Sequence, residues 1–273
     1  MMNRRHGFNS LRKTERIGLA LGGGFARGIA HVGVLRVLEA YGVPVHCVAG
    51  VSAGAVVGAA FASGATSTEI GRVGAEMRFR DVARWTLNRM GLVGSRPMEG
   101  LLQQLLKQSR FEDMPIPLGV VATDLATGDP AVFRDRGDVK LAVRASCSFP
   151  GVFQPIVEGD RLLVDGAVSM QVPAEICRQM GATRVISVVL PPPGWSASRA
   201  NAVSVVNRCF QIVQARAEHT WRAASDVVIT PDVSKMQWNG FGSAEALIRA
   251  GEAAASEALD SILPWVVPEA VCA

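Results

Sequence analysis

A serine set between glycines is the residue of this sequence best suited to chemistry. Ser52 stands at the centre of Gly50-Val51-Ser52-Ala53-Gly54, which matches the Gly-x-Ser-x-Gly pattern of a nucleophile elbow. The apolar residues 46–49 predict a strand before this turn, and the residues from 52 onward, rich in alanine, valine and glycine, predict a helix after it. A helix N-terminus favours negative charge nearby. The five-residue pattern is common by chance, so the prediction of a nucleophilic serine rests on this context.

A serine nucleophile needs a base, and two aspartates are candidates. Asp165 follows the predicted strand 161–164 and precedes Gly166, whereas Asp124 follows the predicted strand 118–122. Functional groups gather at the carboxyl ends of strands in a parallel sheet, which favours both positions. Asp-Gly is also a common turn former, so a structural role for Asp165 stays open. We predict Asp165 as the partner of the serine and keep Asp124 as its rival.

Histidine is the usual base for a serine, and the order Ser52, Asp165, His219 is that of the α/β-hydrolases. His219, however, falls inside a long predicted helix over residues 200–224, which is an unusual place for a triad histidine. His31 lies on a predicted helix over residues 26–41 and is interpreted as structural. A triad through His219 therefore remains only an alternative.

A run of three glycines separates the predicted strand 17–21 from the helix that follows it. The unpaired N–H groups at such a helix start attract an anion. A dinucleotide fingerprint would place its third glycine at Arg27, and a P-loop would need Gly-Lys-Ser or Gly-Lys-Thr, so both patterns fail. An oxyanion hole and a plain tight turn remain as interpretations of Gly22, Gly23 and Gly24.

Short apolar segments alternate with segments of helical periodicity along the chain, which predicts a mostly parallel sheet covered by helices on both faces. The predicted strands are 17–21, 46–49, 118–122, 161–164, 184–190 and 227–230. A capping box at Thr66–Glu69 predicts the start of another helix. The helix after Pro97 carries four leucines, which predict a core position, with a membrane-facing lid as the alternative: Leu101, Leu102, Leu105 and Leu106.

The composition of the chain favours a globular protein over a membrane-spanning, disulfide-rich or nucleic-acid-binding one. The chain has 273 residues, 49% of them hydrophobic and 19% charged, which indicates one large globular α/β domain. No apolar run reaches the roughly 18–20 residues of a membrane span. The five cysteines are widely spaced and the four histidines scattered, so neither a disulfide framework nor a metal site is predicted. The net charge of +4 resides in a basic arm, residues 1–16, with no basic, aromatic face for nucleic acid.

Several motifs together resemble the patatin-like phospholipase family, in its bacterial branch related to neuropathy target esterase. The matching pieces, which cover about residues 17–190, are GGGFARG (22–28), GVSAG (50–54), ATDLATG (122–128), RASCSFPGVFQP (144–155) and VDGAVSMQVP (164–173). The resemblance implies a three-layer α/β/α sandwich with a mostly parallel sheet. It also implies a catalytic domain over residues 17–262, with a C-terminal tail over residues 263–273.

The resemblance further implies a Ser–Asp dyad. Ser52 would be the nucleophile and Asp165 the base, while Gly22, Gly23 and Gly24 would donate to the oxyanion and Arg27 would support their loop. Gly50, Gly54 and Gly166 complete the motifs. One departure is Ala167, where many members of the family have a second glycine after Asp-Gly.

The activity implied is hydrolysis of acyl esters in phospholipids, lysophospholipids or neutral lipids, with no metal or other cofactor. A lipid acyltransferase with the same site, or a catalytically silent binding protein of the same fold, is the alternative. We expect a cytoplasmic protein, with peripheral contact to the inner membrane surface as an option. The sequence predicts no nucleic-acid partner and no particular oligomeric state.

Overall fold

Buried apolar segments of the chain assemble into one central sheet. The computed structural model describes residues 15–88, 90–192, 202–234 and 243–266. In this part of the chain, the sheet has eight strands in the order β10-β9-β1-β2-β5-β8-β7, with β6 paired to β5. Their bounds are β1 Ile17–Leu21, β2 Val45–Val51, β5 Leu118–Asp124, β6 Pro130–Phe133, β7 Ile156–Glu158, β8 Arg161–Asp165, β9 Arg184–Val188 and β10 Val227–Ile229.

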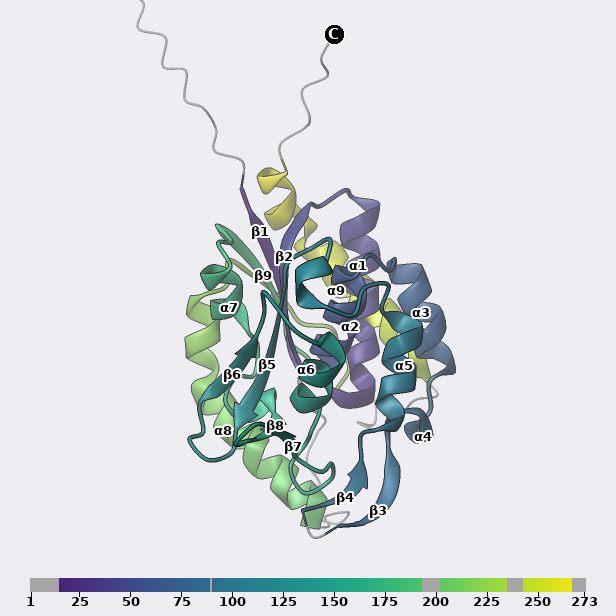
Figure 1. The fold of residues 1–273 in the computed structure, drawn as a ribbon. Helices are drawn as coiled ribbons and strands as arrows, with labels where there is room; N and C mark the ends of the chain where they lie inside the picture. Colours follow the sequence, from purple (N-terminus) through teal and green to yellow (C-terminus); the bar gives the residue numbers. More distant parts are fainter. Residues whose placement is uncertain (1–14, 89, 193–201, 235–242, 267–273) are drawn as a thin grey trace, which may run out of the picture.

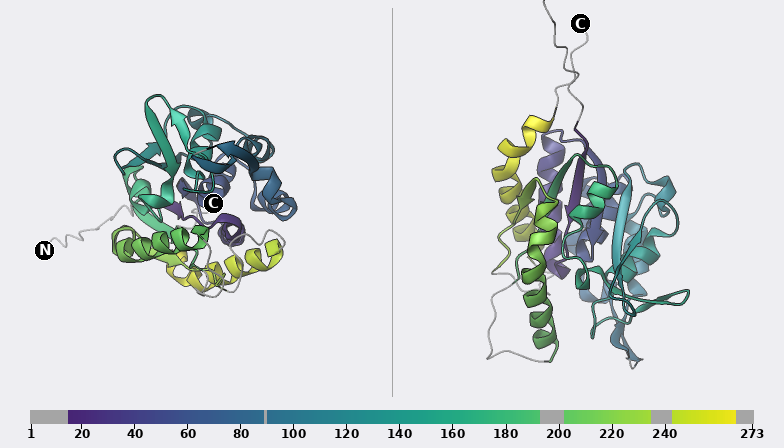
Figure 2. Two further views of the ribbon diagram at one scale, coloured as in Figure 1. Left: turned by 90° about the horizontal axis from the view of Figure 1, so that it is seen from below. Right: turned by 90° about the vertical axis from the view of Figure 1, so that its left-hand side faces the viewer.

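Helices cover both faces of this sheet, as Figures 1 and 2 show. One apolar cluster joins the sheet to α1, α2, α3, α5, α6 and α9, and a second joins the opposite face to α7 and α8. The predicted three-layer α/β/α sandwich is therefore confirmed. The helix bounds are α1 Ala30–Ala40, α2 Ala53–Ala62, α3 Ser67–Glu76, α4 Phe79–Val82, α5 Pro97–Leu105, α6 Val139–Ser146, α7 Ala174–Gln179, α8 Ala202–Ala223 and α9 Ala244–Ile262.

The structure differs from the sequence-based expectations at a few elements. The helix predicted from residue 26 begins as a 3-10 turn, Phe25–Ile29, before α1. A hairpin of β3 (Arg84–Asn88) and β4 (Gly91–Gly94) was not predicted. The capping box before α3 is confirmed. On α5, Leu101, Leu102 and Leu105 are buried, so the core interpretation is correct and these leucines form no membrane-facing lid.

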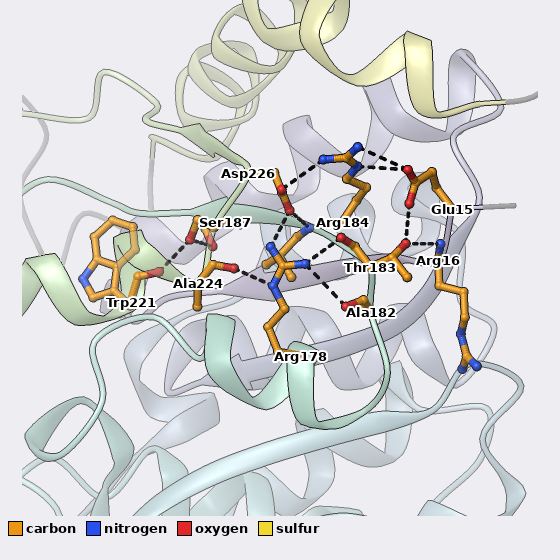
Figure 3. Close-up of polar contacts among 12 residues, drawn as sticks. Glu15, Arg16, Arg178, Ala182, Thr183, Arg184, Ser187, Trp221, Ala224 and Asp226 are labelled. Carbon is orange, nitrogen blue, oxygen red and sulfur yellow. Dashed lines mark hydrogen bonds and ion pairs between the residues drawn. The ribbon is translucent and has the colours of Figure 1, made fainter. Parts of the chain in front are cut away.

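Ion pairs and hydrogen bonds tie the strands together at the end of the sheet where β1 and β9 begin (Figure 3). Asp226 accepts hydrogen bonds from Arg178 Nη2 at 2.6 Å and from the Val185 N–H at 2.7 Å. Arg184 pairs with Glu15 at 3.2 Å, and its guanidinium lies 5.5 Å from the centre of the Trp265 ring. This amino end is therefore a polar anchor, and the opposite, carboxyl end carries the serine.

Most of the predicted terminal arm and tail lies outside the described residues, namely 1–14 and 267–273. Leu263, Trp265 and Val266 pack against the core beyond the end of α9. Among the described residues, no helix combines the length and the apolar character needed to cross a bilayer. The described cysteines are free thiols.

Candidate active site

Ser52 occupies a strained turn between β2 and α2. Its backbone has φ 53° and ψ −122°, a conformation that a residue with a side chain adopts only when its surroundings impose it. The Ser52 carbonyl accepts from the N–H groups of Ala55 and Val56, which starts α2 directly at the turn. A side chain at Gly54 would come within 2.2 Å of the Leu21 carbonyl oxygen. The glycine after the serine thus allows α2 to pack on the end of β1.

Three consecutive residues at the end of α6 contact the two candidate catalytic residues. Ser146 Oγ accepts from the Ser52 N–H at 2.8 Å and donates to the Val121 carbonyl at 2.6 Å. The Cys147 thiol lies beside the Ser52 side chain, and both residues line the same cavity. The Ser148 carbonyl accepts from the Asp165 N–H at 3.0 Å. Hydrogen bonds from this Ser-Cys-Ser segment therefore help to hold the strained turn at Ser52. This role was not predicted from the sequence.

Asp165 is buried beside the serine. Its Oδ1 accepts from the Ala167 N–H at 2.9 Å, and the Ser52 hydroxyl lies near enough for its interaction with the carboxyl group to lower the pKa of Asp165. Thr123 Oγ1 donates to the Asp165 carbonyl at 2.9 Å, so the backbone is fixed as well. Burial raises the pKa of Asp165 to about 7, against the lowering effect of these two contacts of the carboxyl group. The carboxyl group can therefore gain and lose a proton near neutral pH.

β8 brings Asp165 beside Ser52, but not as the carboxyl end of a parallel strand, which corrects the expectation from the sequence. β8 runs antiparallel to β5, so its carboxyl end does not coincide with that of a parallel strand. Asp165 instead pairs with Ala122, and Val121 pairs with Val51, the residue before Ser52. β8 enters the sheet beyond the end of β2, and only its last residue reaches the level of the serine.

The three-glycine loop lies against the serine, with unequal roles for its members. The Gly22 N–H donates to the Val188 carbonyl at 3.0 Å, which corrects the expectation that Gly22 donates to an oxyanion. A Cβ atom on Gly23 would lie 3.4 Å from Ser52 Cβ, so this residue faces the serine. Within the described chain, neither the Gly23 nor the Gly24 N–H has a hydrogen-bond partner. The N–H of Ala53, at the start of α2, is equally free there.

Arg27 is a buried residue of the 3-10 turn that follows this loop. Its guanidinium donates to the carbonyl of Pro191, in the segment after β9, and the side chain is buried. Burial lowers the pKa of Arg27 to about 10, which leaves it charged at neutral pH. It contacts the loop's surroundings and does not line the cavity next to Ser52.

The other candidate residues lie in structural settings. Asp124 Oδ1 accepts from the Ala126 N–H at 2.9 Å, as a turn former does. His219 is exposed on α8, and its Nδ1 lies 3.2 Å from the Arg216 carbonyl of the same helix. His31 is fully buried, with Nε2 2.9 Å from the Gly22 carbonyl oxygen. Among the described residues, no three His, Cys, Asp or Glu side chains are grouped to hold a metal ion.

An apolar cavity opens beside Ser52. Its walls come from the 3-10 turn after the glycines and from α2, α3 and α5, and Cys147 lies next to the serine. The side chains that line it include Phe25, Ile29, Val56, Ile70, Val73, Met77, Met98, Leu101, Leu105 and Phe153. Such a lining suits a hydrocarbon chain and contains no charged group.

Known proteins resemble this chain in sequence. The family model for patatin-like phospholipase matches residues 19–178. An uncharacterized NTE family protein of Mycobacterium tuberculosis is 30% identical over an alignment that covers 93% of this chain and 49% of that protein. The chain thus spans about half the length of this relative.

Two more distant matches extend the comparison. Patatin-like phospholipase domain-containing protein 7 of Rattus norvegicus is 33% identical over 63% of this chain and 13% of its own length. The crystal structure of VipD from Legionella pneumophila superimposes with a TM-score of 0.56 at 14% identity, covering 92% of this chain and 67% of VipD. At this identity the likeness concerns the fold alone.

Proposed function

Because the chain belongs to the patatin-like phospholipase family, we propose that it is a serine lipid acyl hydrolase that uses a Ser52–Asp165 dyad. One observation carries this proposal: the Ser52 hydroxyl, on a strained turn at an apolar cavity, lies beside a buried carboxyl group whose pKa is about 7. A carboxylate with an ordinary pKa is a weak base toward a hydroxyl group. The raised pKa of Asp165 makes it a stronger base for the Ser52 proton.

The reaction would proceed in two steps. Asp165 takes the Ser52 proton as Oγ attacks the ester carbonyl, and collapse of the tetrahedral intermediate expels the alcohol and leaves an acyl-enzyme. Asp165 then returns its proton to the departing alcohol. In the second step Asp165 takes a proton from water, which attacks the acyl group and releases a fatty acid, and Ser52 recovers its proton.

Backbone groups would stabilise the negative oxygen of both intermediates. Three N–H groups without a partner in the described ranges are candidates: those of Gly23 and Gly24 in the glycine loop, and that of Ala53 at the start of α2. The residue after the nucleophile is a usual donor in an elbow. The Ser52 N–H is bound to Ser146 and so takes no part. Donors fixed in this way need no reorganisation during the reaction.

The apolar cavity favours the acyl group over the polar part of a lipid as its occupant. Ala53 and Val56 lie on the first turn of α2, next to Ser52, and line this cavity. An acyl chain in the cavity would leave the alcohol side of the ester to face outward. We therefore propose long-chain acyl esters, with phospholipids among them, as the substrate class.

A fluorophosphonate probe tests the proposal. The purified protein is incubated with the probe, and the adduct is located by mass spectrometry beside an assay of fatty acid release from phosphatidylcholine vesicles. We expect one adduct at Ser52 together with fatty acid release. A folded protein that forms no adduct at Ser52 would refute the dyad and favour the catalytically silent alternative.

The pH dependence of hydrolysis should report the ionisation of Asp165. The base must be unprotonated, so kcat/KM for an uncharged ester should rise tenfold per pH unit below pH 6 and level off above the Asp165 pKa of about 7. The measurement is a kcat/KM profile from pH 5 to 9 at constant ionic strength. A profile that is flat across this range would contradict Asp165 as the base.

Replacing Gly23 with alanine should impair hydrolysis while the fold persists. The added methyl group would lie in ordinary contact with Ser52 Cβ, 3.4 Å away, and would occupy the space next to the donors. We expect kcat/KM to fall by about 100-fold, as when one oxyanion donor is lost, because the methyl group would keep the oxyanion from the Gly23 N–H, which alanine retains. Gly100→Ala is the matched control, because nothing lies within 4 Å of its added methyl group on α5. Equal activity of the two variants would show that Gly23 is not at the reacting atoms.

A further inference from the structure

A buried histidine hydrogen-bonds the glycine loop. His31 lies near the start of α1 with no exposed surface, and its Nε2 is 2.9 Å from the Gly22 carbonyl oxygen. A carbonyl oxygen only accepts, so Nε2 must carry the hydrogen and donate. Nδ1 is buried with no hydrogen-bond partner in the described chain, as fits the unprotonated nitrogen of a neutral ring. Burial lowers the pKa of His31 to about 4, in agreement with that neutral form.

The contact reaches the active site through one peptide group. The Gly22 carbonyl and the Gly23 N–H belong to the same planar trans peptide, so they point in opposite directions. A donor that fixes the carbonyl on one side thereby fixes the N–H on the other. Gly23 is the glycine that faces Ser52.

Nothing else in the described chain gives this peptide an equivalent hydrogen bond. The Gly22 N–H is held by Val188, but that bond fixes the preceding peptide. Glycine at both positions leaves rotation about the flanking bonds open. If this peptide flipped, the Gly23 N–H would turn away from the intermediate and a carbonyl oxygen would face the developing negative charge.

We propose that His31 is a positioning residue, which holds the Gly23 N–H toward Ser52 by donating a hydrogen bond from Nε2 to the Gly22 carbonyl. The proposal rests on the proposed function, because it assigns His31 to the oxyanion hole of that reaction. His31 itself touches neither the substrate nor the reacting atoms. Its ring exchanges no proton in the reaction.

Two variants of His31 test the proposal on a short, soluble aryl ester. His31→Leu keeps an apolar side chain but no donor, whereas His31→Gln keeps an amide N–H that can reach the same carbonyl. We expect His31→Leu to lower kcat about 100-fold with little change in KM, and His31→Gln to recover at least tenfold of that loss. Thermal unfolding monitored by circular dichroism shows that each variant is folded. A folded His31→Leu with wild-type kcat, or a His31→Gln no better than His31→Leu, would overturn the proposal.

A measurement on the unaltered protein covers the case in which the variants do not fold. Nitrogen-15 NMR identifies which ring nitrogen of His31 carries hydrogen, and an alkyl trifluoromethyl ketone adds to an activated serine to give a stable oxyanion. We expect the Nε2–H tautomer and a downfield shift of the Gly23 amide proton when the ketone adds. An Nδ1–H tautomer, or a Gly23 amide proton that does not move, would overturn the proposal. A wild-type protein that neither hydrolyses the ester nor binds the ketone would instead refute the proposed function.

Discussion

Ser52→Ala is expected to lower kcat/KM for ester hydrolysis by at least about 10⁴-fold, because it removes the only atom that can form the acyl-enzyme. The methyl group of alanine fits the space that the serine side chain leaves. The Ser52 N–H keeps its bond to Ser146, so the strained turn should persist. Steady-state hydrolysis of a soluble ester measures the loss.

The matched control for this variant is Ser256→Ala. Ser256 is an exposed serine on α9 whose hydroxyl bonds only within its own helix in the described chain. It should leave kcat/KM and fluorophosphonate labelling unchanged. If Ser52→Ala retained more than a few per cent of the activity, another nucleophile would have to carry the reaction.

Asp165→Asn is expected to lower kcat/KM by about 10³-fold, within the usual range for loss of a general base. The asparagine amide oxygen can still accept from the Ala167 N–H, so the side chain keeps its place, but it cannot take the Ser52 proton. Asp124→Asn makes the same chemical change at the rival aspartate and should leave the rate unchanged. The opposite ranking of these two variants would transfer the role of base to Asp124.

The same Asp165→Asn substitution should stabilise the fold. The pKa of Asp165 is about 7 in the folded protein and 3.8 in its ordinary state, so the folded protein binds the proton more tightly than the unfolded chain does. The free energy of unfolding therefore falls as pH rises from 3.8 to 7, by on the order of 4 kcal/mol, and stays low above pH 7. Asparagine does not ionise and avoids this cost.

Urea denaturation at pH 4.5 and pH 8 measures this effect. Asp165→Asn should exceed the wild-type free energy of unfolding mainly at pH 8, while Asp124→Asn should not. A variant that is less stable than the wild type at pH 8 would mean that the carboxylate is solvated in the folded protein. If Asp165→Asn lost activity but gained stability, the loss of activity could not be attributed to unfolding.

The sequence was most informative where a function depends on neighbours along the chain. The elbow around Ser52, the three glycines and the capping box at Thr66–Glu69 are local patterns, and the structure builds the elements they predict. The apolar run of β1 also indicated its own burial. Each of these features is decided within a few residues.

What the sequence did not reveal depends on pairing across long distances. The antiparallel direction of β8 follows from its pairing with β5, which no segment of β8 itself encodes. Two hydrogen bonds of the site join residues far apart in the chain. The Gly22 N–H donates to the Val188 carbonyl, and the Ser52 N–H donates to Ser146 Oγ. The sequence feature that could have indicated the second bond is the polar Ser-Cys-Ser segment at the end of α6.

The polar contacts at the amino end of the sheet suggest how the protein could be oriented when it is immobilised on a surface. Glu15 and Trp265, near the two ends of the described chain, both contact Arg184 at the start of β9, whereas Ser52 follows the carboxyl end of β2. A tether attached at Glu15 or Trp265 would leave from the amino end of the sheet, opposite the carboxyl end of β2 that Ser52 follows. On a bead or a sensor chip, such a protein would turn Ser52 outward, toward vesicles flowing past.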